Sequence, residues 1–314
     1  MEMYPLKSTP VFKSRIWGGR TLQEVFCKDL PPGEKIGESW EIADLPEGKS
    51  TIGNGSLQGQ TLGSVVRRHG EAIVGKESCE PFPLLIKFLD AQQVLSVQVH
   101  PDAETCRRMG RGDMKTECWY VIQAQPGAVI YKGFRKPIAR DQFAAAIHDG
   151  TAADLLAEVP VSAGECHFIP AGTAHAIGAG LLIAEIQTPS DTTYRVFDWN
   201  RVDDSGKPRQ LHIEEALESI HFDMTPDRLS VTKVGRLVDC DHFKVDKGHR
   251  VEGGEVFLSR GVMRVLIVLS GDGTILSRQA EPVDFSAGDS LMIPAAFEGT
   301  MRFDRETEYL VVTV

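Results

Sequence analysis

The 314-residue sequence has no apolar run near the roughly twenty residues that a membrane-spanning helix needs. Its first residues, MEMYPLKSTPVFKSRIWGG, lack the apolar core of a signal peptide. Six cysteines occur and none forms a CxxC pair, so a disulfide-rich secreted scaffold is excluded and reduced thiols are favoured. We therefore expect a cytoplasmic protein without a membrane partner.

Negative charge exceeds positive charge. The chain has 34 Lys and Arg against 44 Asp and Glu, a net charge of -10, and no basic block, which argues against a nucleic-acid partner. Arg107, Arg108 and Arg111 come closest to a basic cluster, and we interpret them as a solvated helix face. The hydrophobic content of 42% and charged content of 25% are typical of a globular protein.

Helix signals are few, and short alternating runs separated by Gly, Pro and Asp dominate. The sequence therefore predicts a mainly β fold. We expect helices at four places, each with an apolar stripe or a capping residue: from Thr61 onward, over Asp102–Met109, across 137–158, where Thr151 resembles the start of a capping box, and over His212–Ile220.

The pattern divides the chain into two parts. After Pro226 helix signals almost vanish, so we expect a site-bearing domain over residues 1–224 and a second β domain without metal ligands over residues 225–314. A motif that occurs twice in the chain supports this division. Gly164-ECHFI-Pro170 and Gly288-DSLMI-Pro294 share one spacing, but Gly299 stands in the second copy where His175 stands in the first.

Polar side chains interrupt one strand pattern in a way that needs an explanation. Leu95, Val97 and Val99 alternate with Ser96, Gln98 and His100, and a period of two places Gln98 and His100 on the same face. Unpaired polar groups are costly on a buried face, so the two side chains form either a hydrogen-bonded core pair or part of a site.

Glu117 and His175 complete a possible ligand set. Glu117 shares a face of the strand KTECWYVI with Lys115, and His175 ends the stretch GECHFIPAGTAH. A divalent ion held by two neutral imidazoles, one amide oxygen and one carboxylate keeps a single positive charge. Such a site suits an anionic substrate or a developing oxyanion.

The motifs resemble a known family. The pattern G-x5-P-x-G-x2-H of Gly164–His175 is the second half of the cupin signature. Six segments in order, covering residues 11 to about 215, resemble the short bacterial form of the type I mannose-6-phosphate isomerases: RIWGG (15–19), GESWEI (37–42), QVHPD (98–102), KTECWYV (115–121), PAGTAHAIG (170–178) and EIQTPSDTTYRVFDW (185–199).

This resemblance implies a fold of two cupin (jelly-roll) barrels with helices inserted in the first domain. It implies one divalent metal per chain, usually Zn2+, with other divalent metals as alternatives. The implied ligands are Gln98, His100, Glu117 and His175. The extra helical domain of longer family members has no counterpart here, which leaves one wall of the site to be supplied by other residues.

The implied reaction interconverts mannose 6-phosphate and fructose 6-phosphate through a cis-enediolate. The resemblance implies catalytic roles for Arg195, Lys115, Asp191 and Glu185, and substrate binding by Arg195, Lys115 and Trp17. Simpler interpretations stay open: Arg195 in an ion pair with Asp191 or Asp198, Asp191 as a turn residue, Lys115 in solvent and Trp17 in the core.

We expect a hexose phosphate as the small-molecule partner and a monomer or homodimer as the assembly. Two rival functions are compatible with a cupin. One is an iron-dependent dioxygenase, which would use a third His more often than Gln. The other is a non-catalytic sugar-binding regulatory protein that kept the fold and lost turnover.

Overall fold

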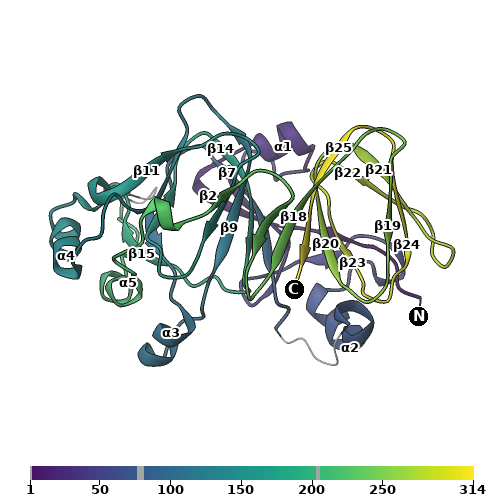
Figure 1. Cartoon of the computed structure of the whole chain (residues 1–314), viewed down its shortest axis with the longest axis horizontal. Coiled ribbons are helices and arrows are strands. Elements are labelled where there is room, and N and C mark those ends of the chain that lie inside the picture. Colours follow the sequence, from purple (N-terminus) through teal and green to yellow (C-terminus); the bar gives the residue numbers. More distant parts are fainter. Residues whose placement is uncertain (1, 76–80, 203–205) are drawn as a thin grey trace.

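Four larger antiparallel β-sheets lie in succession across the described part of the molecule, and a two-stranded sheet accompanies them (Figure 1). The computed structural model describes residues 2–75, 81–202 and 206–314. Helices within these ranges are short, so the mainly β fold predicted from the sequence is confirmed. Cys79 lies outside the described residues, and the five other cysteines are free thiols.

Sheets I and II hold most strands of the N-terminal part. Sheet I has the order β11-β10-β13-β8-β15, with β8 (Val97–Val99), β10 (Val129–Phe134), β11 (Leu156–Pro160), β13 (His175–Ile177) and β15 (Tyr194–Phe197). Sheet II has the order β16-β12-β9-β14-β7-β3-β2, with β2 (Val11–Gly19), β3 (Ile36–Ile42), β7 (Leu85–Ala91), β9 (Glu117–Ala124), β12 (Cys166–Ile169), β14 (Leu181–Gln187) and β16 (Val231–Thr232).

Sheets III and IV hold the C-terminal strands. Sheet III has the order β17-β18-β25-β20-β23-β1-β6, with β1 (Leu6–Thr9), β6 (Thr51–Ile52), β17 (Arg236–Asp239), β18 (Lys244–Arg250), β20 (Arg264–Ser270), β23 (Ser290–Ile293) and β25 (Thr307–Thr313). Sheet IV has the order β19-β24-β21-β22, with β19 (Glu255–Leu258), β21 (Asp272–Leu276), β22 (Val283–Ser286) and β24 (Gly299–Phe303). The short strands β4 (Asp44–Leu45) and β5 (Gly48–Lys49) pair separately.

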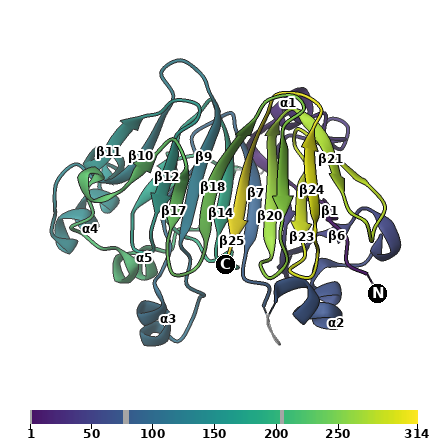
Figure 2. The same ribbon diagram turned by 45° about the vertical axis from the view of Figure 1, so that its right-hand side comes forward.

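Apolar side chains join neighbouring sheets. Trp119 of sheet II packs in one cluster with Ile130 of sheet I. Phe88 of sheet II shares a larger cluster with Val265 of sheet III, and sheets III and IV share a third cluster, which includes Phe303. Figure 2 shows the strands of sheets II and III running side by side in the middle of the molecule.

The first strand of the chain belongs with the last ones. Leu6 of β1 lies opposite Met292 of β23 in sheet III, and β6 extends the same sheet. The N-terminal residues therefore contribute to both halves of the molecule. The division into residues 1–224 and 225–314 stays a prediction, as does the closure of the sheets into two barrels.

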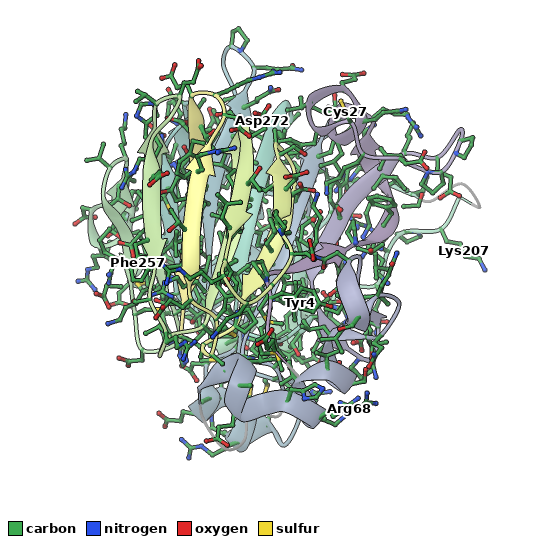
Figure 3. The ribbon with its side chains drawn as sticks, turned by 90° about the vertical axis from the view of Figure 1, so that its right-hand side faces the viewer. Tyr4, Cys27, Arg68, Lys207, Phe257 and Asp272 are labelled. Carbon is green, nitrogen blue, oxygen red and sulfur yellow. The ribbon has the colours of Figure 1, made fainter. Side chains whose placement is uncertain are left out.

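The helices lie at the ends and edges of the sheets. They are α1 (Thr21–Phe26), α2 (Leu62–Val74), α3 (Ala103–Met109), α4 (Arg140–His148) and α5 (Ile213–Ser219), with single 3₁₀ turns η1 (Gly55–Leu57), η2 (Ala152–Leu155) and η3 (Pro226–Arg228). In Figure 1, α3, α4 and α5 lie toward sheet I, and Figure 3 shows Arg68 on α2 beneath the C-terminal strands. None of the described helices is long and apolar enough to cross a membrane.

Two predicted helix starts are confirmed by their caps. The Thr61 hydroxyl accepts the N–H of Ser64 at 3.3 Å, and the Asp102 carboxylate accepts the N–H of Thr105 at 2.7 Å. Helix α3 ends at Gly110, whose positive φ of 65° is a common helix stop.

The prediction of helix across 137–158 is wrong at its C-terminal end. Only a 3₁₀ turn follows Thr151, whose side chain makes no capping bond, and β11 begins at Leu156. The reason is tertiary: β11 pairs with β10, with Val129 opposite Pro160, so the ladder of sheet I overrides the local helical signal.

Candidate metal centre and substrate cavity

Four polar side chains meet between sheets I and II. Gln98 on β8 lies directly opposite His175 on β13, His100 follows β8, and Glu117 begins β9 in the facing sheet. The Nε2 atoms of His100 and His175 lie 3.4 and 3.5 Å from the two Glu117 carboxylate oxygens. Gln98 Nε2 lies 3.3 Å from His175 Nε2.

Backbone carbonyls fix both imidazoles in one tautomer. His100 Nδ1 lies 2.8 Å from the carbonyl oxygen of Thr192, and His175 Nδ1 lies 2.8 Å from that of Thr173. Each Nδ1–H donates outward, so each Nε2 turns a lone pair toward Glu117. Burial, aided by the ammonium of Lys115, lowers the pKa of His100 to about 3, and burial also lowers the pKa of His175. Both rings are therefore neutral, the form that binds metals.

Glu117 is fully buried and remains charged. Burial alone would raise the pKa of its carboxyl, but the ammonium of Lys115 outweighs burial and holds the pKa well below its usual range. The ammonium of Lys115 lies 2.9 Å from Oε2. Within the described residues, Glu117 Oε1 and His100 Nε2 have no hydrogen-bond partner, and Oε2 has only the ion-pair contact with Lys115, which lacks hydrogen-bond geometry.

These orphaned acceptors fit a divalent cation. Buried acceptors without partners are costly, and the ligand atoms of His100, Glu117 and His175 all lie within 4.8 Å of one another. Turning the Gln98 amide over would present Oε1 in place of Nε2 as a fourth ligand. Two nitrogens and two oxygens suit zinc and other borderline divalent metals.

A cavity of about 510 Å³ opens beside this cluster. Gln98 and Lys115 line it, and so do the other residues predicted for the site: Trp17, Glu185, Asp191 and Arg195. The structure therefore brings every predicted site residue either into the ligand cluster or onto the cavity wall.

Glu185 and Lys87 form a buried pair in the floor of the cavity. Lys87 Nζ lies 3.1 Å from Glu185 Oε1 and 3.8 Å from the Asp191 carboxylate, and Trp119 Nε1 donates to Glu185 Oε2 at 3.2 Å. Burial raises the pKa of Glu185, and the negative charge of Glu117 raises it further, although Lys87 and Lys115 oppose this. The sequence predictions did not include Lys87. The pattern that could have identified it is a lysine between apolar neighbours in the segment LLIKFL.

Arg195 is held by neutral partners. Its Nε donates to Ser96 Oγ at 3.2 Å and its Nη1 donates to the Gln210 carbonyl at 2.8 Å. Asp198 instead accepts hydrogen bonds from Arg201 and Arg209. Within the described residues, the ion-pair interpretation of Arg195 is therefore not realised.

Three further charged residues that line the cavity had no role in the sequence predictions: Arg15, Glu38 and Arg209. Arg15 Nε and Trp40 Nε1 each donate to the Glu38 carboxylate at 2.7 Å. Burial would raise the pKa of Glu38, but Lys87 and Arg15 lower it to about 2. Strands β2 and β3 and the segment that contains Arg209 thus contribute charged side chains to the cavity wall.

Comparison with known proteins places this site in a family. The family model "Phosphomannose isomerase type I, catalytic domain" matches residues 4–123. A Bacillus subtilis (strain 168) protein described as "Probable mannose-6-phosphate isomerase GmuF" is 39% identical, and the match covers 96% of this chain and 98% of that protein. The chain belongs to the type I phosphomannose isomerase family.

Other members agree with this membership over their full length. The mannose-6-phosphate isomerase of Streptococcus mutans is 36% identical, covering 98% of this chain and 97% of its own. The crystal structure of the Bacillus subtilis mannose 6-phosphate isomerase superimposes with a TM-score of 0.87 at 30% identity, covering 99% of this chain and all of that one. The resemblance predicted from the motifs is confirmed, and neither the dioxygenase nor the regulatory alternative is favoured.

Proposed function

We propose that this type I phosphomannose isomerase interconverts mannose 6-phosphate and fructose 6-phosphate by moving a proton between C2 and C1 through a cis-enediolate. The observation that carries the proposal is the buried cluster of unpartnered acceptors beside a cavity lined by lysine, arginine and carboxyl groups. Family membership supports the choice of substrate.

Gln98, His100, Glu117 and His175 would hold one divalent ion per chain, with Zn2+ as the first choice. When bound, the ion would supply Lewis-acid polarisation of the substrate. The two outward hydrogen bonds from the Nδ1 atoms to backbone carbonyls keep the imidazoles oriented for it.

The remaining residues act on the sugar directly. Glu185 is a buried carboxyl with a raised pKa, which suits a group that accepts a proton and returns it, and Asp191 supports it through the shared contact with Lys87. Lys115 and Arg195 place positive charge where the enediolate oxygens develop negative charge. Trp17, only 4% exposed, gives the cavity an apolar wall for the sugar carbons.

The cellular setting follows from composition. We infer a cytoplasmic enzyme, a monomer or homodimer, whose partner is a free hexose phosphate and which binds neither nucleic acid nor membranes. The net charge of -10 and the free thiols support this inference.

Isotope transfer tests the reaction. With mannose 6-phosphate deuterated at C2, a coupled assay should detect fructose 6-phosphate, and part of the label should appear in water because the enediolate route releases C2–H as a proton. Formation of fructose 6-phosphate with all of the label at C1 would indicate a hydride shift, and no product at all would remove the proposed substrate.

A further inference from the structure

Three arginines line the cavity, and their positions differ from those of the lysines. Arg15 comes from β2 of sheet II, Arg195 from β15 of sheet I, and Arg209 from the segment that follows β15. The side chains of Arg15 and Arg209 are 35% and 24% exposed, whereas those of Lys87 and Lys115 are 5% and 4% exposed. The ammonium groups therefore occupy the buried end of the cavity, beside Glu117, and the guanidinium groups of Arg15 and Arg209 occupy its open end.

The guanidinium groups of Arg15 and Arg209 are each held in position by hydrogen bonds to a carboxylate. Arg209 donates through Nε and Nη2 to both oxygens of Asp198, with Nε 2.7 Å from Oδ2, and Arg15 donates through Nε to Glu38 at 2.7 Å. Among the described residues, no acceptor is bonded to Nη1 of Arg209, to Nη2 of Arg15 or to Nη2 of Arg195. Each arginine thus keeps one spare donor on a positioned side chain.

Among the lining residues, cationic side chains outnumber acidic ones, in a molecule whose net charge is negative. Five cationic side chains line it (Arg15, Lys87, Lys115, Arg195 and Arg209) against three carboxylates (Glu38, Glu185 and Asp191), although the whole chain carries a net charge of -10. Burial and the neighbouring charges of Arg209, Arg201 and Arg15 lower the pKa of Arg195, in spite of Asp198. An anion at this end would relieve the mutual repulsion of the arginines.

We propose that Arg15 and Arg209 form the subsite for the substrate's phosphate group and so point C1 and C2 at the buried, metal-binding end. This proposal rests on the proposed function for the identity of the substrate as a sugar phosphate. Planar guanidinium donors match the geometry of phosphate oxygens. Arg195 lies opposite Gln98 in the ladder, so its backbone is next to that of a residue at the buried, metal-binding end.

The test compares binding with turnover in two variants from different elements, Arg15→Gln and Arg209→Gln. Sorbitol 6-phosphate is the binding probe because it has no carbonyl group and cannot isomerise. Each variant should lose about 10- to 100-fold in calorimetric affinity for it, since each removes a hydrogen bond between charged groups. The KM for mannose 6-phosphate should rise by a similar factor, while kcat stays within about threefold of the wild-type value and the metal content is unchanged.

Arg201→Gln is the matched control. Arg201 also donates to Asp198, but it does not line the cavity. Its affinity for sorbitol 6-phosphate should remain that of the wild type, which separates a phosphate contact from a loss of local structure around Asp198. Inhibition by inorganic phosphate should weaken in the two cavity variants and persist in Arg201→Gln.

The outcomes separate this proposal from the proposed function. Unchanged affinity for sorbitol 6-phosphate in both cavity variants, or an equal loss in Arg201→Gln, would overturn the phosphate subsite even if the wild type isomerises mannose 6-phosphate. Wild-type protein that binds sorbitol 6-phosphate through Arg15 and Arg209 but turns over no mannose 6-phosphate would support the subsite and overturn the proposed function.

Discussion

At the scale of single residues, the site depends on which nitrogen of each imidazole carries the proton. The carbonyls of Thr192 and Thr173 accept from the Nδ1 atoms of His100 and His175, so both Nε2 lone pairs face Glu117. A carboxylate held charged at full burial then completes a set of acceptors whose one neighbouring donor is the ammonium of Lys115, within the part of the chain that the structure describes. Such an arrangement costs stability unless a cation is bound.

Arg195→Ala should keep the metal and lose most of the turnover. The side chain touches none of the four ligand residues through its hydrogen bonds, which go to Ser96 and Gln210, so the metal content should match the wild type. The kcat should fall by about 100-fold or more, because positive charge beside a developing oxyanion is removed. Steady-state kinetics with metal analysis on the same preparation checks this, and a wild-type rate would exclude Arg195 from the mechanism.

Prediction from the sequence named the four residues that the structure brings together in this cluster, because strand parity and short motifs mark them. Gln98 with His100, and Lys115 with Glu117, are local pairs two residues apart. Lys87, Arg15 and Arg209 were missed because their meaning depends on partners distant in the chain: Lys87 meets Glu185, and Arg209 shares a cavity with Arg15.

At the scale of elements, β10 and β12 bury two basic groups that the proposed reaction does not use. His167 on β12 and Lys132 on β10 are each 1% exposed. Lys132 donates to the carbonyl of Ser230 at 2.9 Å, and His167 Nε2 lies 3.2 Å from Glu165. Burial lowers the pKa of Lys132 to about 8, and burial together with the charge of Lys132 lowers the pKa of His167 to about 4.

The lowered pKa of His167 predicts that the folded protein becomes less stable as the pH falls. The pKa of His167 falls from 6.5 in the unfolded chain to about 4 in the folded one, so between these values the unfolded state binds more protons. The contribution of neutral His167 to the free energy of unfolding is fully present above pH 6.5. It is lost as the pH falls toward 4, and the loss amounts to up to about 3 kcal/mol.

Denaturant unfolding of the wild type and His167→Gln between pH 4 and pH 7.5 measures this contribution. The variant should show the shallower dependence of the unfolding free energy on pH. Parallel curves for the two proteins would contradict the assignment. His148→Gln is the control, because that side chain is 90% exposed.

The elements themselves were predictable where caps and periodicity agree, as in α2 after Thr61 and α3 after Asp102. The prediction failed at β11, whose residues follow a helical stretch and become a strand only because β10 offers a ladder. A local pattern contains no information on such a partner.

At the scale of the whole molecule, sheets II and III share the largest apolar cluster, and β1 pairs with β23. Residues 1–224 expressed alone should therefore expose the apolar face around Phe88 and leave β1 paired with β6 but not with β23. We expect this fragment to aggregate or to melt without a cooperative transition, and co-expression of residues 225–314 should restore a soluble complex. Calorimetry and size-exclusion chromatography check this. A fragment that melts cooperatively and isomerises at the wild-type rate would instead show two independent domains.

The central claim is that one divalent ion held by Gln98, His100, Glu117 and His175 is required for isomerisation of mannose 6-phosphate. The most direct measurement is the metal content and the coupled isomerase rate of one sample, before and after EDTA and after addition of zinc, with His100→Ala beside the exposed control His148→Ala. We predict about one metal ion per chain, activity that disappears with chelation and returns with zinc, neither metal nor activity in His100→Ala, and wild-type values in His148→Ala. Full activity in metal-free protein, or in metal-free His100→Ala, would contradict the account.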